Sequence, residues 1–175
     1  GIEPSVAQVP ALIIVLLGAE IEVLVLSANR DGVTQITEAL EQQHTKLSSL
    51  HIVAHGTPGC LNLGNSQLSF QTLSQQSSSL TRWATILPEK DVLLYGCQLA
   101  KGAMGYLFLQ QLHQLTGANI AASTERVGRI DQQTNWTLDT QLGTVETPVI
   151  FSEQLQQSYA EHFDISLSSD ITTLV

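Results

Sequence analysis

Four short apolar runs occur along the chain, each followed by a polar or glycine-containing turn. They read EIEVLVL over residues 20–26, LHIVA over 50–54, VLLY over 92–95 and ANIAA over 118–122. Each run has the length of a strand, and the first combines β-branched residues with partial alternation of apolar and polar positions. The pattern therefore predicts four strands.

Helical periodicity occupies the intervals between these runs. Apolar residues recur at helical spacing over residues 33–40, 73–87 and 104–115. Asp31 stands where its side chain can cap the first helix, Pro88 stops the second, and Gly117 closes the third. The third interval has the clearest amphipathic pattern, whereas Gln and Ser residues weaken the first half of the second.

Strands that alternate with helices predict an α/β fold, with a mostly parallel sheet covered by helices on both faces. A C-terminal hairpin is expected to follow, with its strands around 136–139 and 144–146. Residues 1–151 are predicted to form this one domain. Residues 152–175 are rich in Ser and Gln. Two interpretations stay open for them: a terminal helix around 155–163 packed on the domain, or a tail that trails from it.

Composition and charge narrow the classes of function. The chain has 175 residues, of which 43% are hydrophobic and 13% charged, and its net charge is -9. Such a chain can bury a core and is not disordered. It has no basic patch with interleaved aromatic residues, which argues against a nucleic-acid partner. The apolar run 11–17 is well short of the roughly 20 residues that cross a bilayer, so no membrane span is predicted.

Two of the predicted strands end in residues that can carry out chemistry. The run 50–54 leads into His55-Gly56, and the run 92–95 leads into Gly96-Cys97. Because functional groups collect beyond the carboxyl ends of parallel strands, imidazole and thiol are expected to face one crevice. The two glycines allow sharp turns and close approach of the backbone.

Each residue of this group has a role in acyl transfer. A nearby imidazolium and the start of the following helix favour the thiolate of Cys97, which is the reactive form. His55 can act as a general acid or base, and the backbone N–H groups of Gly56 and Cys97 can stabilise an oxyanion. Pattern alone leaves a second interpretation open, because a cysteine after an apolar strand is commonly just a buried core residue.

The remaining His and Cys residues near this site support no metal centre. His51 and His55 are four positions apart, but on a strand their side chains sit roughly 13 Å from each other, too far for one zinc ion. His51 is therefore predicted to lie in the core or behind the site. Cys60 follows His55 in a Thr-Pro-Gly-Cys turn. It is predicted to be a spare thiol, with a Cys60–Cys97 disulfide that would silence or switch the site as the alternative.

Six segments of the chain together resemble a bacterial domain of unknown function that is found near the front of very large surface or secreted proteins. That family is grouped with the caspase-like (clan CD) cysteine peptidases, alongside gingipains, legumain and separase. The resemblance spans roughly residues 3–151 and keeps the order of the motifs, which lie at 29–32, 50–59, 61–64, 93–97, 116–118 and 121–124.

The resemblance implies a caspase-like, three-layer α/β/α sandwich in which His55, Gly56, Gly96 and Cys97 form a His-Gly and Gly-Cys dyad site. It also implies that the segment after the next strand, Ser123, Thr124 and Glu125, lines the substrate pocket. Asp31 is expected to reach the same pocket, where two carboxylates would favour a Lys or Arg side chain. The chain is expected to begin inside or just after the family's usual first strand, with residues 2–5 as its end.

The function predicted from these observations is a cysteine endopeptidase that needs no organic cofactor and acts on a polypeptide, with its own parent surface or secreted protein as one candidate. A location at the cell surface or outside the cell follows from the resemblance alone. Two alternatives stay open: an interaction module with a vestigial dyad, and an acyl transferase that uses the same dyad.

Overall fold

The computed structural model describes residues 11–18, 20–43, 47–130 and 133–149. The predicted strand end at 2–5 and the predicted helix or tail at 152–175 lie outside this part of the chain. The described elements, in chain order, are β1 (Leu12–Leu17), β2 (Glu20–Val25), α1 (Gly32–Gln43), β3 (Ser49–Val53), β4 (Gly56–Thr57), β5 (Cys60–Leu63), β6 (Ser66–Ser69), the 3₁₀ helix η2 (Leu73–Gln76), α2 (Ser77–Ile86), β7 (Asp91–Tyr95), α3 (Gly102–Thr116), β8 (Asn119–Ala122), β9 (Gly128–Ile130), β10 (Gln133–Asn135) and β11 (Thr140–Leu142).

A six-stranded mixed sheet forms the centre of the fold, in the order β11-β8-β7-β3-β1-β2. Strands β3, β7 and β8 are parallel neighbours, whereas β1 runs antiparallel to β2 and β3, and β11 antiparallel to β8. All four strands expected from the apolar runs are present as β2, β3, β7 and β8. A further strand that was not predicted, β1, occupies the apolar run 11–17, which is too short to cross a membrane.

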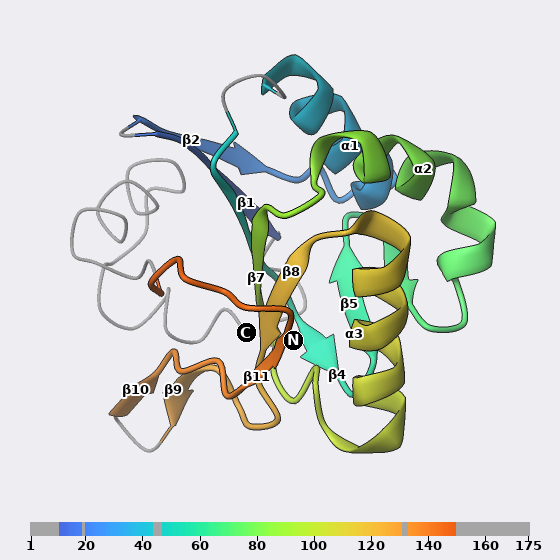
Figure 1. The fold of residues 1–175 in the computed structure, drawn as a ribbon. Coiled ribbons are helices and arrows are strands. Elements are labelled where there is room, and N and C mark those ends of the chain that lie inside the picture. Colours follow the sequence, from blue (N-terminus) through green and yellow to red (C-terminus); the bar gives the residue numbers. More distant parts are fainter. Residues whose placement is uncertain (1–10, 19, 44–46, 131–132, 150–175) are drawn as a thin grey trace, which may run out of the picture.

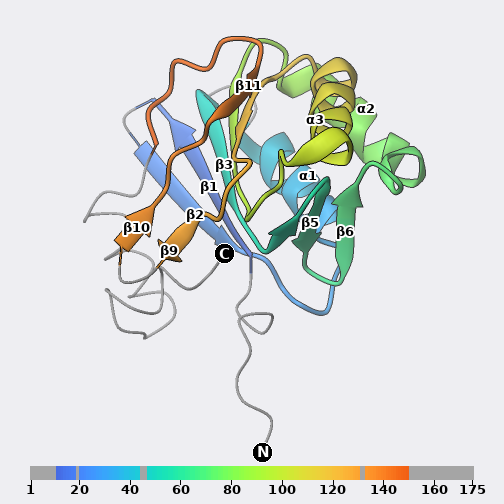
Figure 2. The ribbon, with the colours of Figure 1, turned by 90° about the horizontal axis from the view of Figure 1, so that it is seen from below.

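The three helices that the structure describes all lie on one face of the sheet (Figures 1 and 2). Their apolar residues form one core cluster with the side chains of that face, including Val33 and Ile36 of α1, Trp83 of α2 and Phe108 of α3. The prediction of helices on both faces is therefore wrong for the described residues. Successive crossovers β2–α1–β3, β3–α2–β7 and β7–α3–β8 all advance in one direction across the sheet. Right-handed crossovers in a single direction place every helix on the same side.

The opposite face has its own smaller core. Leu12, Leu93 and Tyr95 of the sheet pack there against Val127 and Trp136. The antiparallel pair β9–β10 lies on this side of the molecule (Figures 1 and 2). The predicted C-terminal hairpin is thus misplaced: the hairpin lies at 128–135, and β11 pairs with β8 instead of with the residues that follow it.

The helix boundaries follow the local chemistry that the sequence displays. The Asp31 carboxylate accepts hydrogen bonds from the backbone N–H groups of Val33 at 2.8 Å and Thr34 at 3.2 Å, which confirms the predicted N-cap of α1. Gly117 adopts the left-handed conformation, with φ of 72°, and closes α3 as predicted. The Gln- and Ser-rich start of the second interval forms η2, and regular α-helix begins only at Ser77.

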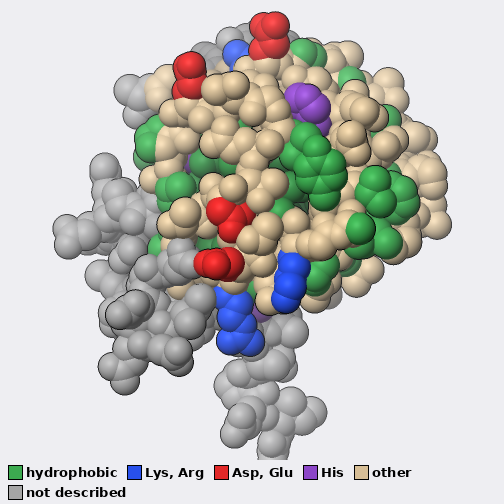
Figure 3. Space-filling view, turned by 60° about the horizontal axis from the view of Figure 1, so that its bottom comes forward, with side chains coloured by type: hydrophobic (Ala, Val, Ile, Leu, Met, Phe, Trp, Pro, Cys, Tyr) green, Lys and Arg blue, Asp and Glu red, His purple; other side chains and the backbone are tan. Residues whose placement is uncertain are grey.

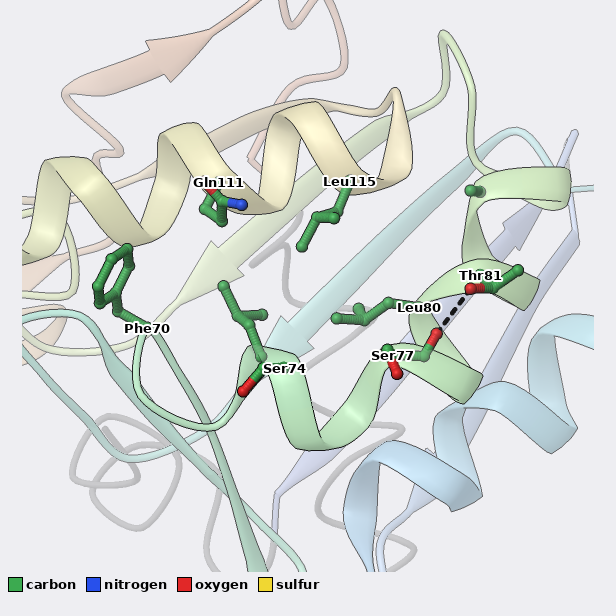
Figure 4. A pocket seen from close by; sticks show the side chains of 9 residues that line it. Phe70, Ser74, Ser77, Leu80, Thr81, Gln111 and Leu115 are labelled. Atoms are coloured by element: carbon green, nitrogen blue, oxygen red, sulfur yellow. Dashed lines mark hydrogen bonds between the residues drawn. The ribbon is translucent and has the colours of Figure 1, made fainter.

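A groove of about 510 Å³ opens between α2 and α3 (Figure 4). Its lining is mostly apolar and uncharged, and consists of Phe70, Leu73, Ser74, Ser77, Leu80, Thr81, Ala84, Gln111 and Leu115. None of these residues belongs to the predicted dyad or to the predicted substrate pocket, so the groove is a feature of the helical layer. Among the described residues, no helix combines the length and the apolar character needed to cross a membrane.

Candidate active site

The pairing of β3 with β7 places His55 and Cys97 side by side. The two parallel strands are in register up to Val53 opposite Tyr95, and the ladder continues with a hydrogen bond of 3.2 Å from Ala54 N to the Tyr95 carbonyl oxygen. Beyond the paired residues, a Cβ atom at Gly56 would lie 3.1 Å from the nitrogen of Cys97, so the segments His55-Gly56 and Gly96-Cys97 lie next to each other.

Cys97 lies on the face of the sheet without helices. Val53 of β3 and Tyr95 of β7 belong to the core cluster on that face. Cys97 Sγ contacts the carbonyl oxygen of Val127, which packs in the same cluster. His55 and Cys97 are both half-buried. The thiol is therefore not sealed in the apolar core.

The two glycines allow the close contact between the strand ends. A Cβ atom at Gly56 would lie 3.0 Å from the carbonyl carbon and the Cα atom of Gly96, and 3.1 Å from the nitrogen of Cys97. A Cβ atom at Gly96 would lie 2.7 Å from Cδ2 of the buried Leu61 in β5. The backbones of His55-Gly56 and Gly96-Cys97 thus touch, as predicted from the two glycines, which have no side chain to prevent a close approach.

Cys97 sits in a sharp turn rather than at a helix start. The turn occupies residues 97–100, and α3 begins only at Gly102. The expected help from the helix dipole is therefore small, because its effect falls off within the first turn. Gln98, directly after the cysteine, adopts a left-handed conformation with φ of 57°. Such a conformation is costly for a residue other than glycine and is concentrated at functional sites.

The loop 123–127 lies beside this turn and brings the predicted pocket residues to Cys97. Ala100 N donates to the Ser123 carbonyl oxygen at 2.9 Å, and Gln98 N donates to the Glu125 carbonyl oxygen at 2.8 Å. Ser123 is buried, and its hydroxyl accepts a hydrogen bond from Glu125 N at 3.0 Å. Glu125 itself is exposed. The structure therefore brings Ser123, Thr124 and Glu125 alongside the candidate nucleophile.

Asp31 has a different set of contacts. Besides capping α1, its Oδ1 accepts a hydrogen bond from the Ser66 hydroxyl at 3.0 Å, and its backbone bridges to Gly64. These contacts tie the start of α1 to the turn between β5 and β6. A role of Asp31 in the substrate pocket stays a prediction, and we assign no site chemistry to it.

Charged side chains of both signs gather on the face that contains the carboxyl ends of the parallel strands (Figure 3). The exposed charged residues near Cys97 include Lys101, Glu125 and Arg126. Asp139 adds a carboxylate that holds Thr124. Burial raises the pKa of Asp139, but hydrogen bonds from Thr124 and Thr140 outweigh it and lower this pKa below its usual value. Asp139 is therefore negatively charged at neutral pH.

His51 lies behind the site, as predicted. Its ring is fully buried, with Nδ1 2.9 Å from the Tyr95 hydroxyl and Nε2 3.2 Å from the Ser49 hydroxyl. The ring stacks on Tyr95 with centroids 5.8 Å apart. Burial lowers the pKa of His51 to about 3, although Asp91 acts in the opposite direction. His51 is thus a neutral structural residue near neutral pH, and among the described residues no cluster of three or more His, Cys, Asp or Glu side chains forms a metal site.

Cys60 begins β5, directly after the turn that contains Pro58 and Gly59. Both Cys60 and Cys97 are free thiols. Burial raises the pKa of the Cys60 thiol, and a hydrogen bond with the Thr57 side chain partly opposes this effect. The spare-thiol interpretation of Cys60 and the alternative disulfide with Cys97 both stay predictions.

Three contributors to the site escaped the sequence analysis. They are Gln98 with its left-handed backbone, Val127, whose carbonyl oxygen contacts the thiol, and Asp139, which anchors Thr124. A residue between a candidate nucleophile and a helix is a position where strain could have been anticipated. The other two contacts join residues 30 and 15 positions apart in the sequence, and no local pattern reports them.

Comparison with known proteins supplies one match. No curated protein and no solved structure resembles the chain closely enough to be called similar. A family model described as "Domain of unknown function (DUF4347)" matches residues 2–163. The match covers nearly the whole chain, including the two strand ends with His55 and Cys97. The chain therefore belongs to the DUF4347 family of domains of unknown function.

Proposed function

We propose that this domain is a cysteine endopeptidase of the caspase-like type, with His55 and Cys97 as its catalytic dyad. The observation that supports the proposal is the close approach of Gly56 to Gly96 and Cys97, just beyond the ends of the parallel strands β3 and β7. In the reaction, the Cys97 sulfur attacks the carbonyl carbon of a peptide bond. His55 delivers a proton to the leaving amine, and water then hydrolyses the thioester and releases the new carboxyl terminus.

The surrounding backbone supplies the remaining parts of the mechanism. The backbone of Gly56 approaches the nitrogen of Cys97, and the N–H groups of both residues serve as the oxyanion donors in this proposal. The segment Ser123–Glu125 forms the substrate pocket, and the exposed carboxylate of Glu125 favours substrates with Lys or Arg before the cleaved bond. A panel of fluorogenic peptides in which basic residues give no advantage over neutral or acidic ones would refute this preference.

A natural substrate of such a domain is a large surface or secreted protein, with the parent chain of this domain as the first candidate. This part of the proposal rests on the resemblance to caspase-like domains of giant surface proteins.

One observation favours a non-enzymatic function instead. The groove between α2 and α3 is bordered by exposed hydrophobic side chains, including Phe70, which is 40% exposed, and Leu115, which is 39% exposed. Exposed apolar surface of this kind is typical of interaction sites. An interaction module with a vestigial dyad is therefore the second candidate function.

Labelling with an electrophilic peptide probe separates the two functions. If the domain is a peptidase, the wild-type protein reacts at Cys97, and both Cys97→Ala and His55→Ala lose the label. Cys60→Ala, which removes the second half-buried thiol, is the matched control and should retain the label at Cys97. Labelling that is independent of His55, or absent in all proteins, would favour the interaction module. A transfer product in place of a hydrolysed one would identify an acyl transferase with the same dyad.

The contact between the glycines predicts the effect of a small substitution. We expect Gly56→Ala to lower the rate of probe labelling about tenfold, because a displacement of even a few tenths of an ångström between nucleophile and base is costly. The added Cβ would push His55-Gly56 away from the backbone of Gly96 and Cys97. Gly18→Ala, in the turn between β1 and β2, is the control for backbone strain: φ of 67° makes alanine costly there, but this turn lies at the end of the sheet where β3 begins, so labelling of the folded protein is unchanged. Equal rates in the two variants would contradict the proposed geometry.

A further inference from the structure

The thiol that would attack a substrate is engaged by its own chain. Cys97 Sγ lies 3.4 Å from the carbonyl oxygen of Val127 and donates a hydrogen bond to it. Attack requires the thiolate, which has no proton to donate and is repelled by a carbonyl oxygen. The contact with Val127 therefore has to break before Cys97 can attack a substrate.

The segment that makes this contact is fixed at several points. Val127 is 1% exposed and packs in the core of the face without helices. The carbonyl oxygen of Glu125 accepts the hydrogen bond from Gln98 N at 2.8 Å, next to Cys97. Thr124 donates to the Asp139 carboxylate from its backbone N at 2.9 Å and from its hydroxyl at 2.5 Å. The segment is thus held against the turn at 97–100 and cannot leave Cys97 without breaking these contacts.

We propose that Arg126, Val127 and Gly128 form an autoinhibitory strap that lowers the fraction of molecules with a free Cys97 thiol, an inference that rests on the proposed peptidase function. The strap presents the Val127 carbonyl group where a substrate carbonyl would approach the sulfur. Release of the strap frees the thiol and opens the space beside it. The link between Thr124 and Asp139 is the exposed anchor just before the strap, and loss of this link is the step that loosens it.

The accessibility of each thiol measures the strap directly and does not depend on catalysis. The full chain is treated with iodoacetamide for increasing times, and mass spectrometry of peptides reports the alkylation of Cys97 and Cys60 separately. Asp139→Ala is expected to raise the alkylation rate of Cys97 about tenfold, because hydrogen bonds to a charged carboxylate are strong enough to shift a local opening equilibrium by that factor. Cys60 serves as an internal reference whose rate stays constant.

Asp91→Ala is the matched control. The Asp91 carboxylate also fixes a distant segment, since it accepts hydrogen bonds from Thr147 N at 3.0 Å, the Thr147 hydroxyl at 2.7 Å and Glu146 N at 3.1 Å. It lies at the amino end of β7, whereas Cys97 follows the carboxyl end. Loss of this second link should leave the alkylation rate of Cys97 at the wild-type value.

The outcomes separate the strap from the proposed function. A rise for Cys97 in Asp139→Ala alone supports the strap. An unchanged rate in Asp139→Ala, or an equal rise in both variants or at both thiols, overturns it. Probe labelling of the same variants then tests function: labelling that requires His55 and increases with release of the strap supports a latent peptidase. If release of the strap exposes Cys97 but probe labelling does not depend on His55, both autoinhibition and the peptidase function are refuted. The alkylation result would still show that the segment covers Cys97.

Discussion

Replacement of His55 by alanine is expected to lower kcat for peptide hydrolysis by about 10²- to 10⁴-fold, the usual contribution of general acid–base catalysis. The leaving amine of a peptide is a poor leaving group unless it receives a proton. In the proposed mechanism His55 delivers this proton, because Gly56, which follows it, lies against the backbone of Cys97. KM should change little, because the imidazole acts on the reacting bond rather than on the rest of the substrate.

The matched control is His113→Ala. His113 is a half-buried histidine in the last turn of α3, where its Nδ1 lies 2.6 Å from the carbonyl oxygen of Ala118. It can affect stability but not proton transfer at Cys97. The comparison is made on a fluorogenic peptide with kcat and KM determined separately. A loss of kcat that is equal in the two variants would remove His55 from the mechanism.

Those parts of the fold that depend on residues close together in the sequence could be predicted. The strands β2, β3, β7 and β8 could be predicted because each coincides with a short run of continuous or alternating apolar residues. The ends of α1 and α3 could be predicted from local chemistry. The Asp31 carboxylate accepts a hydrogen bond from a backbone N–H group in the first turn of α1, and Gly117 adopts the left-handed conformation that closes α3. None of these features requires knowledge of the tertiary structure.

Features set by long-range pairing could not be predicted in the same way. The sequence of the run 11–17 does not reveal which strands it pairs with. In the structure β1 lies between β2 and β3 and interrupts the expected parallel order. The side on which the helices lie depends on the direction in which successive strands are added, which periodicity does not reveal. The strands β9, β10 and β11 have three residues each, too few for a recognisable pattern.

The candidate site shows the same division. His55, Gly56, Gly96 and Cys97 were identified because each follows a strand directly, so that the position of the strand fixes the position of the residue. Glu125 was placed by the family resemblance and lies beside the thiol through its backbone. Val127 and Asp139 act through contacts across the fold, and the strap that they hold became visible only with the three-dimensional structure.

The fold is also expected to lose stability in mild acid because of His51. An unfolded histidine has a pKa of about 6.5, whereas burial lowers the pKa of His51 in the folded protein to about 3. As the pH falls below about 6.5, the unfolded chain binds a proton that the folded protein does not bind until about pH 3. The contribution of the neutral ring to stability is therefore complete above this range and is lost progressively through it.

At pH 4.5, about two pH units below the pKa of an unfolded histidine, the loss amounts to about 2–3 kcal/mol in the free energy of unfolding. His51→Asn removes the titrating group and keeps a polar side chain near the Tyr95 hydroxyl. Between pH 7.5 and 4.5, the decrease in its free energy of unfolding should therefore be smaller than the decrease in the wild type by this amount. Urea denaturation at both pH values measures the difference, and acidic groups such as Asp91 cancel because both proteins contain them. His113→Asn is the control and should follow the wild type. If wild type and His51→Asn lost equal stability, the ring of His51 would have to be accessible to protons, and the buried contact with Tyr95 beneath Cys97 would not exist as described.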